Sequence, residues 1–64
     1  MTVNGQYYAH RDGLTLHRLL DDLELRPANI VVMHGDAIYR AGKIPDVPVG
    51  SDDVIEIVKM MQGG

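Results

Sequence analysis

Gly63 and Gly64, which close the sequence, are the residues best placed to take part in chemistry. Glycine has no Cβ, so two glycines make the thinnest arm that a polypeptide can form and reach backbone angles closed to other residues. Four residues beyond Met60 span about 13 Å when extended. We therefore expect a flexible tail, residues 61–64, in which Gln62, Gly63 and Gly64 enter the active site of a partner. The group presented there is the free carboxylate of Gly64.

The other polar side chains do not form a catalytic or metal-binding pattern. His10, His17 and His34 are widely spaced, whereas zinc sites draw their ligands from tight pairs. Asp21 and Asp22 are adjacent, so they point to different faces of a helix and make no acid–base pair. The sequence also lacks a glycine-rich phosphate loop. We expect no metal site, no bound cofactor and no catalytic residue in this chain.

Composition narrows the class of protein. Sixty-four residues form one domain, and the absence of cysteine excludes disulfides and thiol chemistry. Nine acidic and six basic residues give a net charge of −3, with no basic patch of the kind that binds nucleic acid. There is no apolar run of membrane-spanning length and no signal-peptide pattern. These features predict a cytoplasmic monomer that binds neither nucleic acid nor membrane.

The first half of the sequence predicts a hairpin and then a helix. Residues 1–4 alternate between apolar and polar side chains, as a half-buried strand does. Asn4-Gly5 is a strong hairpin signal, and residues 6–10 are expected to form the second strand of the hairpin. Thr15 is placed to cap a helix that ends at about Leu25, because the residue before Pro27 is disfavoured in a helix. The helix has a single apolar stripe, which consists of Leu16, Leu19, Leu20 and Leu23.

The second half predicts three further strands. Residues 30–34 and 37–40 form strands around a turn at Gly35-Asp36, and residues 54–60 form the last strand. Residues 41–51 contain two prolines and form a loop with at most one helical turn, whose conformation the pattern leaves open. The predicted fold is α+β, with a mixed sheet of four to five strands packed on one helix. The first and last strands are rich enough in apolar residues to lie centrally.

Taken together in this order, these parts resemble the ubiquitin-like sulfur carriers of the β-grasp fold, and most of all the ThiS family. The resemblance covers essentially the whole chain, as one ThiS-like domain over residues 1–64. It departs from the family at Asp52-Asp53, where ThiS chains often have Gly-Asp, and in the lack of a tryptophan after Arg40. The matching segments are Val3-Asn4-Gly5, Thr15–Leu20, Val31–Ile38, Ile55–Val58 and Gly63-Gly64.

The resemblance implies a specific chemistry at Gly64. In this family a ThiF-like adenylyltransferase, similar to ubiquitin-activating enzymes, adenylates the terminal carboxylate with ATP and magnesium. A sulfur donor such as a cysteine desulfurase then converts the adenylate to a thiocarboxylate. A ThiG-like thiazole synthase takes the sulfur for the thiazole moiety of thiamine. The carrier is then a protein cosubstrate and not an enzyme.

A docking face is predicted on the last strand. Period two places Glu56, Val58 and Met60 on one side, and Glu56 should face water, so we expect Val58 and Met60 to be exposed. We expect Val32 and Met61 to join this face. An exposed apolar patch on a small domain marks a contact site. The resemblance implies that the activating enzyme docks there.

Three alternatives stay open. The chain is also compatible with a carrier like the small subunit of molybdopterin synthase or one for cysteine biosynthesis, although those chains tend to be longer. It is compatible with a protein modifier joined to targets through Gly64, because the activation chemistry is shared. A plain interaction domain with an inert tail is the third.

Overall fold

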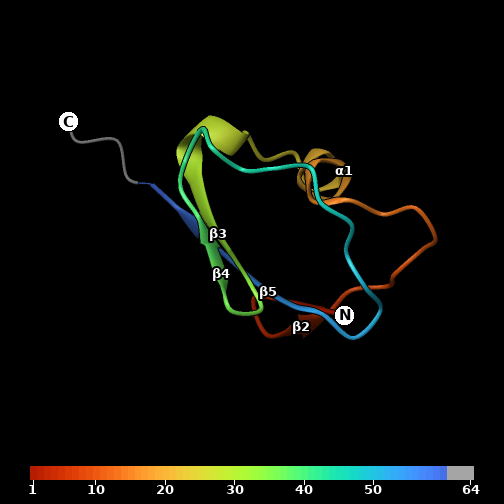
Figure 1. Ribbon diagram of the computed structural model, residues 1–64. Helices are drawn as coiled ribbons and strands as arrows, with labels where there is room; N and C mark the ends of the chain where they lie inside the picture. Colours follow the sequence, from red (N-terminus) through yellow and green to blue (C-terminus); the bar gives the residue numbers. More distant parts are fainter. Residues whose placement is uncertain (61–64) are drawn as a thin grey trace.

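The computed structural model describes residues 1–60 and shows one α-helix packed on a five-stranded sheet (Figure 1). The strand order is β2-β1-β5-β3-β4, in which β1 and β5 are parallel and the other neighbours antiparallel. The predicted α+β, ubiquitin-like β-grasp fold is confirmed, as is the internal position of the first and last strands. The elements are β1 (Thr2–Val3), β2 (Gln6–Tyr7), α1 (Leu16–Asp22), the 3-10 helix η1 (Pro27–Asn29), β3 (Ile30–His34), β4 (Ala37–Tyr39) and β5 (Val54–Lys59).

The β1–β2 hairpin turns at the predicted position but is shorter than expected. Asn4 and Gly5 have φ values of 54° and 80°, as a type I′ turn requires. The Tyr8 N–H donates to the Met1 carbonyl at 2.9 Å, so Met1 lies opposite Tyr8. The residues after Tyr8 have no partner on β1, and this is why the second strand does not continue to His10.

The N-terminus of α1 is capped by its own threonine and by a distant aspartate. Thr15 Oγ1 accepts the Arg18 N–H at 3.3 Å, which confirms the predicted cap. Asp46 Oδ1, from the loop that follows β4, accepts the His17 N–H at 3.1 Å. Asp46 therefore satisfies a second backbone N–H of the first helical turn, which has no acceptor within the helix.

The predicted end of the helix at Leu25 is wrong, because α1 ends at Asp22. Glu24 adopts a left-handed backbone with φ 58°, and its N–H donates to the Asp21 carbonyl at 3.0 Å. The Leu25 N–H donates back to the Leu20 carbonyl at 2.9 Å. These two bonds form a Schellman closure, with Glu24 where glycine is usual. Leu25 then packs beside the core from outside the helix.

The core lies on one side of the sheet, between the strands and α1. Three of the four residues of the predicted stripe, Leu16, Leu19 and Leu20, are buried, and the fourth, Leu23, is half-buried. Ile44 and Val49 bring the loop of residues 40–53 into the same core. None of the helices within residues 1–60 is long and apolar enough to cross a membrane. The other buried core residues are Met1, Val3, Leu14, Ile30, Val32 and Ile55.

Replacing Glu24 with glycine should stabilise the protein by about 1 kcal/mol. A left-handed backbone costs a residue with a Cβ roughly 1–2 kcal/mol, and the greater freedom of glycine in the unfolded chain offsets part of the gain. The control is Glu24→Gln, which removes the charge but keeps the Cβ and should gain only a few tenths of a kcal/mol. Urea unfolding measures both, and equal stabilities of the two variants would contradict the strain explanation.

Candidate partner-binding site

Strand β5 lies in the middle of the sheet (Figure 1), and residues 61–64 follow it closely in the sequence. It pairs with β3 from Ile30 opposite Lys59 to His34 opposite Ile55, and with β1 on its other side. The Met60 N–H donates to the Asn29 carbonyl at 2.7 Å, so the pairing continues to the last described residue. The point from which residues 61–64 continue is therefore held against η1.

The predicted roles of Met61, Gln62, Gly63 and Gly64 fall on residues outside the described part of the chain. The flexibility expected of residues 61–64, the approach of Gln62 and Gly63 to a partner and the modification of Gly64 all stay predictions. What the structure provides is the base of this segment at Met60.

Asn4 extends the support of β5 beyond the end of β1. Its backbone N–H donates to the Ile55 carbonyl at 2.9 Å, and its side-chain Oδ1 accepts the Ile57 N–H at 2.7 Å. The side chain thus satisfies a strand N–H that two-residue β1 is too short to reach. In the sequence Asn4 signals only a turn, and nothing local to it indicates this contact.

The outward residues of β5, apolar except for Glu56, form a row on the sheet face that α1 leaves uncovered. Val58 and Met60 are 50% and 51% exposed, as predicted, and Val54 and Glu56 are exposed beside them. Ile55, in the opposite phase of the strand, is fully buried in the core. The predicted facing of β5 is therefore confirmed, while its binding role stays a prediction.

The prediction that Val32 joins this row is wrong. Val32 is fully buried, and it lies opposite Ile57 on the face toward α1. Its neighbour Val31 lies opposite Val58 and is half-buried on the outer face. The strand is apolar at four successive positions from Ile30, so its own pattern does not show which phase points inward; pairing with β5 decides it.

The apolar row continues across the sheet on both sides of β5. Opposed residues in a sheet project from the same face, so the register extends the surface without further assumption. Met33 lies opposite both Glu56 and Ile38, and Thr2 lies opposite both Val54 and Tyr7. Ile38 and Tyr7 are 68% and 81% exposed. We call this surface the outer face; it consists of Thr2, Tyr7, Val31, Met33, Ile38, Val54, Glu56, Val58 and Met60.

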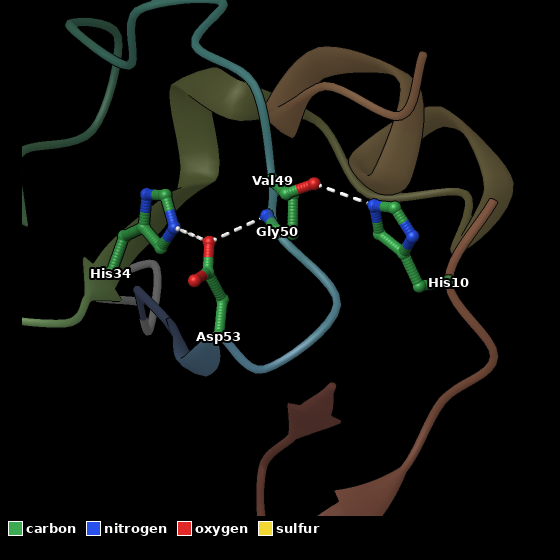
Figure 2. Close-up of polar contacts among 5 residues, drawn as sticks. All are labelled: His10, His34, Val49, Gly50 and Asp53. Carbon is green, nitrogen blue, oxygen red and sulfur yellow. Dashed lines mark hydrogen bonds and ion pairs between the residues drawn. The ribbon is translucent and has the colours of Figure 1, made fainter. Parts of the chain in front are cut away.

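Two histidines attach the loop of residues 40–53 to the rest of the domain. His10 Nε2 lies 2.7 Å from the Val49 carbonyl oxygen, and His17 Nε2 lies 2.6 Å from that of Ile44 (Figure 2 shows the first). A carbonyl oxygen only accepts, so each Nε2 must carry its proton and donate. Each histidine can make this contact either as the neutral tautomer with the proton on Nε2 or as the imidazolium. The sequence carried no signal of these partners.

The third histidine binds Asp53, the residue just before β5. Asp53 Oδ2 accepts from His34 Nε2 at 2.6 Å and from the Gly50 N–H at 2.7 Å (Figure 2). The hydrogen bond from His34, followed by that from Gly50, lowers the pKa of the Asp53 carboxyl below its ordinary value. The Asp53 carbonyl also accepts the Thr2 N–H at 3.1 Å. Asp53 therefore fastens the beginning of β5 to three other parts of the chain.

Each histidine is thus used separately and none meets another. No group of three or more His, Cys, Asp or Glu side chains in residues 1–60 is arranged to hold a metal ion. At the helix N-terminus, a hydrogen bond from the Thr15 side chain and one from the His17 N–H lower the pKa of the Asp46 carboxyl. These contacts favour the ionised form of Asp46, which suits its role as a helix cap.

Comparison with known proteins agrees with this geometry. The sequence matches the model of the ThiS family over residues 1–64. It is also 30% identical over 53 residues to the sulfur carrier protein ThiS of Thermus thermophilus. That alignment covers 83% of this chain and 83% of the relative, so the similarity extends through most of both domains.

The pH dependence of stability should reveal the role of Asp53. Because its pKa is lowered in the folded state, the carboxylate contributes stability above its unfolded pKa, about 3.8, and this contribution is lost as the pH falls through the lower folded value. Asp53→Asn should therefore be less stable than the parent at pH 7, and the difference should shrink below about pH 4. Urea unfolding across this range measures it.

The control for this series is Asp52→Asn, which removes an exposed neighbouring carboxylate from the same turn. It should leave the stability at pH 7 nearly unchanged, because surface charges of this kind contribute little. A deficit of Asp53→Asn that stays constant with pH would contradict the assignment, since it would show that ionisation of Asp53 does not contribute.

Proposed function

The chain belongs to the ThiS family, and we propose that it carries sulfur on the carboxylate of Gly64 for the synthesis of the thiazole of thiamine. The observation that carries the proposal is the family match through the final Gly63-Gly64. The central position of β5 supports it, because a strand held on both sides gives a rigid base for a reacting tail. A second support is the free apolar face beside that base.

The proposed reaction explains why the carrier needs no catalytic residue. A carboxylate is a poor acyl donor because its leaving group would be oxide. An oxygen of the Gly64 carboxylate attacks the α-phosphate of ATP, pyrophosphate leaves, and the product is an acyl adenylate. The terminal sulfur of a persulfide on the donor then attacks the carbonyl carbon, AMP leaves, and an acyl disulfide joins carrier and donor. A second thiol attacks the donor-side sulfur of that disulfide, which releases the thiocarboxylate and leaves a disulfide on the donor side. Phosphoryl chemistry of this kind depends on positioning and on Mg²⁺, which the activating partner provides.

Three partners follow from this sequence of steps. A ThiF-like adenylyltransferase binds the carrier and activates Gly64. A sulfur donor such as a cysteine desulfurase supplies the sulfur, and a ThiG-like thiazole synthase receives it. All of these partners must admit a narrow tail, which Gly63 and Gly64 permit because neither has a Cβ.

The outer face and the tail should act together. Ordering a chain segment costs about 1–2 kcal/mol per residue, so insertion of residues 61–64 needs a compensating contact. Val58 and Met60 are exposed at the end of the strand that continues into this segment. Since Met60 is bonded to Asn29, a partner seated on the outer face meets the tail at a fixed starting point.

Val58→Asp should leave the fold intact and weaken binding to the adenylyltransferase. The new charge faces water in the free protein but would lie unpaired in an apolar contact, a loss of at least tenfold in affinity. The matched control is Val32→Asp, which places the same charge in the core and should unfold the domain. Calorimetric titration and circular dichroism measure the two effects. A folded Val58→Asp protein that binds as tightly as the parent would exclude this face as the docking surface.

Deleting Gly64 should abolish adenylation without changing stability. The carboxylate would then lie one residue short, roughly 3 Å from the attacked position, and reacting atoms must be held at near-attack distance. ATP–pyrophosphate exchange by the adenylyltransferase should be strong with the parent, sharply reduced with Gly64→Ala and absent with the deletion. Undiminished exchange with the deletion would refute the proposal.

Intact mass of the protein from its native host separates carrier from modifier. One sulfur in place of one oxygen is the thiocarboxylate, whereas a ladder of higher masses shows conjugation to other proteins. The mass therefore tests the product, and the exchange assay tests the activated residue.

A further inference from the structure

The cationic residues of this acidic protein gather at one end of the sheet. Of its six lysines and arginines, four lie near the end of β5 from which residues 61–64 continue. Lys59 is opposite Ile30 at the start of β3, and the Gly42 N–H donates to the Pro27 carbonyl at 2.9 Å, which places the loop after β4 beside η1. We call these four residues the basic collar: Arg26, Arg40, Lys43 and Lys59.

All four collar residues are exposed and form no ion pair with residues 1–60. By contrast Arg11, on the helix side, pairs with Asp22 at 2.7 Å. Arg26 and Lys59 line one shallow depression together with Met60, and Glu24 is the acidic residue on its wall. The collar therefore has an excess of positive charge that the described part of the chain does not neutralise.

Two exposed acidic residues lie at the other end of the sheet. Asp36 and Asp52 occupy the turns at the opposite end of β5, which the 3.1 Å bond from the Gly35 N–H to the Val54 carbonyl brings together. These two carboxylates are thus separated from the collar along the length of β5, whereas Glu24 lies beside Arg26 and Lys59. The collar is the group of cationic residues at the end of β5 from which residues 61–64 continue.

We propose that the basic collar pairs with acidic side chains around the opening, on the adenylyltransferase, into which the tail is inserted. This inference rests on the proposed function, because it assumes that such an enzyme receives the tail. Like charges gathered without internal partners repel one another and favour a complementary surface. An acidic rim would attract this end of the sheet, orient the tail toward the opening and speed encounter.

ATP is a less suitable partner for the same charges. The phosphates that react with Gly64 lie at the tip of the tail, about 13 Å from Met60 when it is extended. The collar surrounds the base of that segment, where the rim of the opening must lie. The distance therefore favours the protein surface over the nucleotide.

The test compares two doubly substituted proteins of equal charge. Arg26→Gln with Lys43→Gln removes two collar charges, and Arg11→Gln with Arg18→Gln removes two on the helix side. Each double substitution changes the net charge from −3 to −5 (−3 − 2). Association with the ThiF-like adenylyltransferase of the same organism is measured by stopped flow at about 10 mM and about 1 M salt, where the Debye length falls from about 30 to about 3 Å.

The collar protein should associate about tenfold more slowly than the parent at low salt and equally fast at high salt. The association rate of the helix-side protein should fall far less, because Asp22 already neutralises Arg11 and neither Arg11 nor Arg18 belongs to the collar. Equal slowing of the two proteins, or no slowing of either, would overturn the proposal. A raised KM for ATP with unchanged association would also overturn it, since the collar would then act on the nucleotide.

ATP–pyrophosphate exchange at saturating carrier separates this inference from the proposed function. The collar protein should reach the same maximal rate as the parent, because Gly64 is intact. If the parent associates but supports no exchange, the proposed function fails while the association rates still decide the role of the collar. If the parent does not associate at all, both fail.

Discussion

The pairing of β5 on both sides is the constraint on which the rest of the structure depends. Thr2 meets Val54 and Val3 meets Ile55, so the sheet closes only when the two ends of the chain come together. Bringing together residues so far apart in the sequence costs conformational entropy, and contacts between near neighbours do not offset that cost. β1 is too short to offset it alone, and the side chain of Asn4 adds the next bond along β5. The same closure places the base of the tail in the middle of the sheet and not at an edge.

A domain of this size can cover only one face of its sheet. The seven residues of α1 and the buried Ile44 and Val49 complete a core on the inner side. The loop that carries these two residues has no helix or strand of its own. A backbone bridge between Thr15 and Pro48 holds it against the start of α1, and hydrogen bonds from His10, His17 and His34 add to this attachment. The outer face is left apolar and open, a state that suits a protein whose partners supply the missing layer.

Sequence reasoning succeeded where the determining interactions are local. The Asn4-Gly5 turn, the Thr15 cap and the outward phase of Val58, which Glu56 revealed, all depend on near neighbours. It failed for Val32, because β3 is apolar at successive positions and only its pairing with β5 decides which side chains point into the core. It also failed for the end of the helix, because Glu24 has the left-handed backbone that is typical of glycine. The histidine partners are 39, 27 and 19 residues away, and a distance of that kind leaves no local pattern.

In the proposed function and the proposed collar contact, the partner is recognised through the outer face, the basic collar and residues 61–64. Physical chemistry gives each of these a different role. Apolar contact on the outer face governs mainly how long a complex lasts, while exposed charges govern mainly how fast it forms. In the proposed function the carrier must leave its activating enzyme before it can deliver sulfur, so very tight apolar binding would slow turnover. A charged collar raises the frequency of productive encounters without lengthening the complex. A half-apolar face beside a basic collar therefore fits a protein that visits several partners in succession.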